Sequence, residues 1–182
     1  MSSSTRLPSV RLPRSALSIL SRRCTSLGAS GIDALYEAGH RAGADVLETL
    51  GPSPAALPAP EFWSRLDAEI RQAGLGSLSY RPVCRRSGAV AWRGSAEAVE
   101  PTTTGRGCHF ATGLLRGVLS HAAGRPVDVT EVRCGSDDQP CWFLFGSAET
   151  VREVRADVGA LVDEGVAGIG AAGPPSTESL ER

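Results

Sequence analysis

The residues best suited to chemistry are three cysteines and a glutamate. Cys108 and Cys141 bound a 34-residue stretch in which Glu131 lies three residues before Cys134. Thiolate and carboxylate groups in a four-coordinate cage are ligands that zinc accepts in closed structural sites. These four side chains are therefore candidates for one zinc site. The cysteines can also be small buried apolar residues, and a disulfide between Cys134 and Cys141 is a further alternative.

The sequence positions of these residues set a condition on the site. Cys134 and Cys141 flank a turn, so a hairpin would bring their sulfur atoms together. Cys108 begins a predicted helix, whose N-terminus favours a thiolate. Glu131 and Cys134 have opposite parity, so a regular strand would point them to opposite faces. They can share a metal only if the strand ends or bulges near Arg133, which the nearby glycine allows.

The apolar pattern predicts the elements that must position these side chains. Apolar residues recur on one face at helical spacing in four segments, which cover residues 32–50, 60–73, 108–123 and 151–162. Strands are predicted from their alternation and β-forming residues, and these cover residues 77–92 (a hairpin), 127–132 and 141–145. The last strand is apolar on both faces and is therefore expected to be central. The predicted fold class is α/β in the α+β sense, an antiparallel sheet flanked by helices.

Composition divides the chain into three parts. Residues 1–29 are rich in serine and arginine and are predicted to be a disordered basic arm. Residues 30–164 form the predicted domain, and residues 165–182 form a flexible tail rich in glycine, proline and serine. No apolar run approaches the ~18 residues that span a bilayer, and the arm is a poor secretory signal. We therefore expect a cytoplasmic location, where cysteines are thiols or metal ligands rather than disulfides.

The composition also argues against several functions. All 19 basic residues are arginine, which excludes a Schiff-base lysine and a phosphate-loop lysine. The net charge of −1 argues against general nucleic-acid binding. The three histidines form no recognisable nucleophile–base pair with a serine or cysteine. We therefore expect no catalytic residues and no enzymatic activity.

A family resemblance is carried by the segment CHFATGLLRGVLSHAAGRPVDVTEVRCGSDDQPCWFLF, which resembles the core of the 4-vinyl reductase domain. It has a cysteine opening a glycine-containing helix, a strand ending in Glu-x-x-Cys, and a second cysteine leading an aromatic strand. ALYEAGHRAGADVLETL is similar to the family's N-terminal helix, and EFWSRLDAEIRQAGLGSLSY to its second helix and first strand. The resemblance covers roughly residues 30–146, and its specific motif covers residues 108–145.

This resemblance implies a fold, a metal and a class of function. The family provides sensory domains of phenol- and xylene-responsive transcription activators and a protein of bacteriochlorophyll synthesis, and it shares its fold with transport-particle subunits at the Golgi. In the aromatic sensors, three cysteines and one glutamate hold a zinc. By motif, these ligands fall on Cys108, Glu131, Cys134 and Cys141. The turn between the last two cysteines is about one residue shorter here than in the sensors.

Aromatic side chains are candidates for lining a ligand pocket. They make up only 5% of the chain, and the resemblance implies a pocket between the helices and the sheet. Tyr36 and Trp92 are predicted to line this pocket. The alternative is that the aromatic rings only fill the core.

Together these features favour a non-catalytic, zinc-stabilised module that binds a small hydrophobic or aromatic ligand and signals through a protein partner. Alternatives are a scaffold subunit without a ligand and an accessory of tetrapyrrole synthesis. No nicotinamide or flavin fingerprint supports the reductase activity that the family name suggests. Two glycine pairs, Gly39 with Gly43 and Gly113 with Gly117, offer helix faces for close approach. They predict a homodimer built partly on the first helix.

Overall fold

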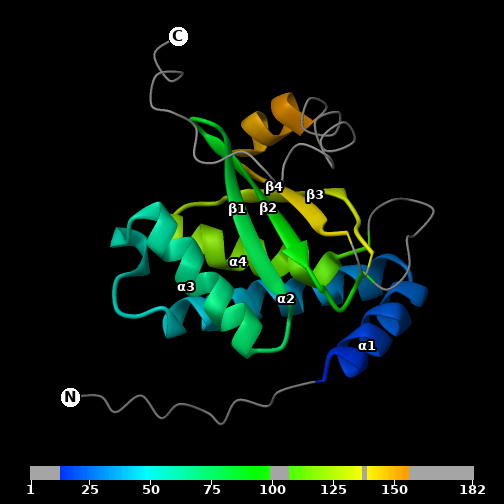
Figure 1. Cartoon of the computed structure of the whole chain (residues 1–182). Coiled ribbons are helices and arrows are strands. Elements are labelled where there is room, and N and C mark those ends of the chain that lie inside the picture. The colour runs from blue at the N-terminus through cyan, green and yellow to red at the C-terminus, as the bar shows by residue number, and fades with distance from the viewer. Residues whose placement is uncertain (1–12, 99–106, 137–138, 156–182) are drawn as a thin grey trace.

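The computed structural model describes residues 13–98, 107–136 and 139–155, which form helices around a four-stranded sheet (Figure 1). In chain order, the elements are α1 (Arg14–Ser26), α2 (Ala29–Thr49), the 3-10 helix η1 (Pro54–Ala56), α3 (Ala59–Gln72), β1 (Ser77–Cys84), β2 (Ser87–Arg93), α4 (His109–Ala123), β3 (Asp128–Arg133) and β4 (Cys141–Gly146). A further helix begins at residue 148 and is described to residue 155. The strand order is β1-β2-β4-β3, and each neighbouring pair is antiparallel. The predicted α+β class is confirmed.

The two middle strands, β2 and β4, are buried on both faces of the sheet. On one face, Val90 and Phe143 belong to the main core, which α2, α3 and α4 complete. On the other face, Leu144 packs with Val151 of the helix over residues 148–155. Figure 1 shows α2, α3 and α4 on one side of the sheet and the last helix on the other. The prediction that residues 141–145 form a central strand is therefore confirmed.

Helices α2 and α4 pack with their backbones in direct contact. A Cβ atom at Gly39 would overlap the carbonyl oxygen of Phe110, and one at Gly113 would overlap that of Tyr36. The second glycine of each pair lies equally close to the facing backbone. The glycine faces therefore serve packing within the chain. The prediction that a homodimer forms on these glycine faces is wrong, because α4 of the same chain already covers the glycine face of α2.

Helix α1 lies within the segment for which the sequence predicts a disordered arm. Its Ser21 Oγ donates a hydrogen bond to Glu97 Oε1 (3.2 Å), and Arg14 Nη2 donates one to the backbone oxygen of Ser95 (3.4 Å). Both partners lie more than 70 residues away in the sequence, as their separations of 76 and 81 show. The prediction of disorder is wrong for α1, because contacts this distant leave no mark on local composition.

Parts of the sequence predictions fall outside the described residues. These parts are the start of the arm (residues 1–12), the flexible tail (165–182) and the end of the helix predicted over 151–162. The limit of 164 also lies outside the described residues, and the domain limits of 30 and 164 both stay a prediction.

Candidate metal centre and ligand cavity

Four side chains that could hold a metal ion converge at one end of the sheet. Cys108 is the N-cap residue of α4, and Glu131 lies on β3. Cys134 directly follows β3, and Cys141 begins β4. Their ligand atoms, three Sγ atoms and a carboxylate oxygen, lie within 4.8 Å of one another. The Sγ of Cys108 lies 3.3 Å from that of Cys141 and 3.9 Å from that of Cys134.

An irregularity in β3 brings Glu131 and Cys134 to the same site. The register of β3 against β4 shifts between Glu131 and Arg133, and β3 ends at Arg133. This is the bulge that the opposite parity of the two ligands requires. A Cβ at Gly135 would overlap the backbone of Gln139, so glycine allows the tight return to β4. The sequence condition on the site is met in the structure.

The two carboxylate oxygens of Glu131 differ in their hydrogen bonding. Oε2 accepts hydrogen bonds from the backbone N–H groups of Gly107 (2.9 Å) and Cys108 (3.2 Å). Oε1 is buried and has no hydrogen-bond partner among the described residues. A buried polar atom without a partner costs free energy, and a metal ion bound to it would remove that cost. The orphaned oxygen and the donor types therefore fit a metal ion.

Burial and mutual contact set the charges within the cluster. Hydrogen bonds with the thiols of Cys108 and Cys134, together with one from the Gly135 N–H (3.3 Å), lower the pKa of Cys141 below its ordinary value. Contacts with Cys134 and Cys141 raise the pKa of Cys108. Burial raises the pKa of Glu131. The protein alone thus favours one thiolate, and a bound divalent cation would favour the deprotonated form of the other donors as well.

Glu97 is a buried carboxylate that the sequence analysis missed. It accepts hydrogen bonds from the backbone N–H groups of Phe110 (3.0 Å) and Ala111 (2.8 Å), in the first turn of α4. Burial raises its pKa to about 7. No pattern in the sequence marked it: the side chain of Cys108 does not cap α4, so the free N–H groups of the first turn need other acceptors, but this becomes visible only in the folded chain.

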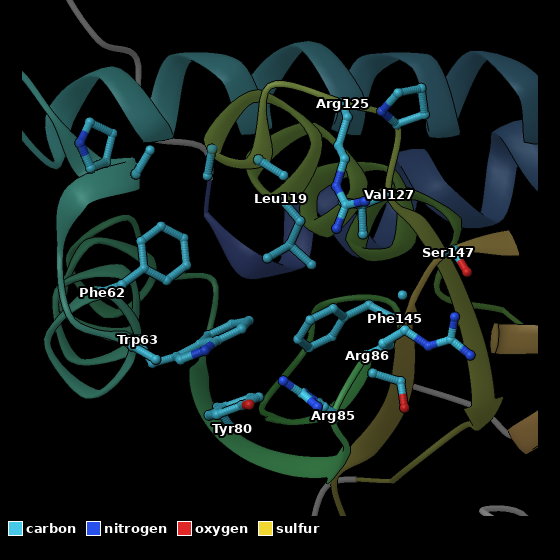
Figure 2. Close-up of a pocket in the computed structure, with 18 of the residues that line it drawn as sticks. Phe62, Trp63, Tyr80, Arg85, Arg86, Leu119, Arg125, Val127, Phe145 and Ser147 are labelled. Carbon is cyan, nitrogen blue, oxygen red and sulfur yellow. The ribbon is translucent and has the colours of Figure 1, made fainter.

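A cavity of about 440 Å³ lies at the opposite end of β4 from the cysteines. Four aromatic side chains surround it, as Figure 2 shows: Phe62, Trp63, Tyr80 and Phe145. Trp63 and Tyr80 stack with ring centroids 4.8 Å apart and planes 6° apart. Leu119 of α4 and Val127, just before β3, contribute further apolar surface. This volume falls within the range of ~300–1,000 Å³ that is common for small-molecule sites.

The two residues predicted to line the pocket, Tyr36 and Trp92, do not line this cavity. Trp92 is 2% exposed, belongs to the main core and donates a hydrogen bond from Nε1 to the backbone oxygen of Leu75 (2.8 Å). It pairs with Cys141, at the cysteine end of the sheet. The hydroxyl of Tyr36 accepts a hydrogen bond from Arg116 (2.6 Å). Aromatic type alone does not reveal at which end of an element a ring lies, so the sequence could not predict the lining of this cavity.

The fold and the site together define a class of small α+β module. An antiparallel sheet carries a thiol–carboxylate cluster at one end and an aromatic cavity at the other. No helix in the described parts of the chain is long and apolar enough to cross a membrane.

One solved structure similar to this chain is the phenol-responsive sensory domain of the transcription activator PoxR with phenol, with a TM-score of 0.67 and 16% sequence identity. The match covers 84% of this chain and 83% of the other. The fold that the sequence resemblance implies, that of a phenol-responsive sensory domain, is thus confirmed. No family model matches the chain. A search of curated proteins also finds no match.

Proposed function

We propose that this chain is a non-catalytic module that binds a small hydrophobic or aromatic ligand and acts in sensing through a protein partner. The observation that carries the proposal is the cavity walled by four aromatic side chains. Support comes from the shared fold of a sensory domain whose structure contains phenol. Burying one or two rings gains only a few kcal/mol after the costs of association, so affinities of about 10–100 µM are expected.

Ligand binding can be tested with 2-naphthol, a neutral aromatic probe. Binding should raise the melting temperature and quench tryptophan fluorescence, because the probe would lie against Trp63. Trp63→Phe should lose the quenching. Trp142→Phe is the matched control, because Trp142 packs on the other face of the sheet. A wild-type protein that shows neither a thermal shift nor quenching with saturating 2-naphthol contradicts the proposal.

We also propose that Cys108, Glu131, Cys134 and Cys141 hold a structural zinc ion. In a tetrahedral site with Zn–S distances of about 2.3 Å, neighbouring sulfur atoms lie ~3.8 Å apart. The 3.9 Å between two of the sulfur atoms agrees with this geometry, and the 3.3 Å between another two is shorter. Four protein ligands leave no position for water, so such a zinc would stabilise the fold rather than catalyse hydrolysis. We also propose a cytoplasmic location, where reducing conditions would keep these cysteines available as metal ligands.

Metal analysis of Cys134→Ser tests the zinc proposal. The purified wild-type protein should contain about one zinc per chain, and the variant should lose it and unfold or aggregate. The physical reason is that zinc contributes on the order of 10 kcal/mol to folding in small structural sites. Cys84→Ser is the control, because Cys84 is exposed and outside the cluster. A folded wild-type protein without zinc would refute the proposal.

A homodimer remains part of the proposal, but on a surface other than the glycine faces. Ile19, Leu20 and Leu27, on and next to α1, are large apolar side chains that are about half exposed or more, at 52%, 48% and 71%. Contiguous apolar surface marks interaction sites, and we propose that these side chains contribute to one. Light scattering should therefore give a dimer mass that Leu20→Asp reduces to a monomer mass. A monomer mass for the wild-type protein would contradict the dimer.

A further inference from the structure

Three arginine side chains accompany the aromatic wall of the cavity. Arg85 and Arg86 come from the turn between β1 and β2, and Arg125 comes from the connection between α4 and β3. All three are exposed, so they stand where the cavity meets solvent. In Figure 2, Arg125 reaches toward the cavity from the side opposite to Arg85. Two segments distant in the sequence thus bring positive charge to one opening.

Among the residues that the structure describes, no carboxylate lines the cavity beside these arginines. None of the three guanidinium groups makes a hydrogen bond or ion pair with another described residue. Other exposed arginines of the chain do pair, as Arg41 does with Glu37 (2.8 Å). Gathering like charges without partners raises their electrostatic energy, which a bound anion would lower.

We propose that the cavity selects an aromatic anion, a molecule with a carboxylate group attached to its ring system. This inference rests on the proposed function, because it names the chemical class of the ligand for the same cavity. The ring would pack against Trp63, Tyr80 and Phe145, which gives apolar contact without selecting charge. The carboxylate would meet the guanidinium groups, whose planar donors match it in a bidentate geometry.

Two naphthalene probes of the same shape test this inference. 2-Naphthoate carries the carboxylate, and 2-naphthamide replaces it with a neutral group of nearly the same size. We expect naphthoate to bind about tenfold more tightly, measured by calorimetry. Raising the salt concentration from about 0.05 to 0.5 M should weaken naphthoate binding and leave naphthamide binding unchanged, because salt screens the exposed charges.

Arginine variants then assign the preference to this site. Arg125→Gln should weaken naphthoate binding about fivefold and change naphthamide binding less than about twofold, because only the charged contact is lost. The triple change of Arg85, Arg86 and Arg125 to Gln should remove the preference. Arg41→Gln is the matched control, because it removes one positive charge from an exposed position that does not line the cavity.

The possible failures are distinguishable. Equal binding of the two probes overturns the inference but leaves the proposed ligand-binding function intact. A preference for naphthoate that persists in the triple variant also overturns the inference, because the charge selection would then lie elsewhere. Failure of both probes to bind overturns the inference and the proposed function together.

Discussion

At the scale of single residues, two buried carboxylates organise the start of α4. Glu97 and Glu131 each accept hydrogen bonds from two backbone N–H groups in or just before the first turn. A helix N-terminus leaves such groups free and favours negative charge. Because Cys108 is the N-cap residue of the same helix, both carboxylates hold a metal-ligand candidate in place. Glu97 does so from outside the metal cluster.

The pKa of Glu97 makes stability depend on pH. Burial raises this pKa from an ordinary 4.5 to about 7 in the folded protein. Between these values, the unfolded chain binds fewer protons than the folded protein, so the free energy of unfolding falls as pH rises through this window. We expect a loss on the order of 3 kcal/mol between about pH 4.5 and pH 7.5, relative to a variant without the group. Urea unfolding at constant free zinc measures this loss of unfolding free energy.

Glu97→Gln is the variant that removes this titration. The difference in unfolding free energy between the wild type and Glu97→Gln should change with pH as described. Glu149→Gln is the control: it changes an exposed carboxylate, and its unfolding free energy should depend on pH as that of the wild type does. Parallel pH profiles for the wild type and Glu97→Gln would show that Glu97 titrates in its ordinary range.

Residue types alone predict the metal-binding candidates but not their support. Thiols and a carboxylate within 34 residues, with a required bulge near Arg133, make these four side chains candidates, and the family resemblance is what assigns them as one ligand set. Glu97 carries no such signal, because its role depends on the tertiary position of α4. The same limit explains Trp92: its aromatic type is visible in the sequence, whereas its hydrogen bond to Leu75 and its place in the core are not.

At the scale of elements, the contact of α2 with α4 depends on glycine. Gly113→Ala would improve helix propensity by about 1 kcal/mol. Its methyl group, however, would overlap the carbonyl oxygen of Tyr36, a backbone atom that cannot move without shifting α2. Forced separation of packed elements costs about 1–3 kcal/mol, so we expect the overlap to prevail, with a net loss of up to ~2 kcal/mol.

Urea unfolding of the zinc-loaded variant measures this loss. Ala38→Ser is the control, because Ala38 lies on the same helix pair but is exposed, and its substitution should change stability by less than ~0.5 kcal/mol. A Gly113→Ala protein at least as stable as the wild type would mean that the two helices separate at no cost.

Elements with strong local signals in the sequence are observed close to their predicted bounds. The third predicted helix, over residues 108–123, is observed as α4 (His109–Ala123) and ends at Gly124 in the left-handed conformation. Helix α1 has no such signal: its first turn contains no acid, and no side chain caps it. Its stability comes from α2 and from the bond of Ser21 to Glu97, which only the folded chain brings together.

At the scale of the whole molecule, two elements connect the cysteine cluster with the cavity. Strand β4 begins at Cys141 and carries Phe145 near its other end, against the cavity. Helix α4 follows Cys108 and carries Leu119 to the same cavity. The metal candidates and the cavity are thus opposite ends of one packed unit. If metal release at one end requires this packed unit to open, ligand binding at the other end will affect it.

With zinc at the proposed site, its release should therefore slow when the cavity is occupied. Cys108 and Cys141 are 1% and 0% exposed, so a chelator can remove their metal only after the unit of α4 and β4 opens. A ligand that binds the closed form reduces the open population by a factor of 1 + [L]/Kd, which is about tenfold at a concentration of ten Kd. We expect 2-naphthol at this level to slow zinc transfer to a colorimetric chelator about tenfold.

Trp63→Ala is the control, because this variant should bind the probe poorly. Its rate of zinc release should be the same with and without 2-naphthol. Equal release rates for the wild type with and without bound 2-naphthol would mean that zinc leaves by fraying of the turn between Cys134 and Cys141 alone.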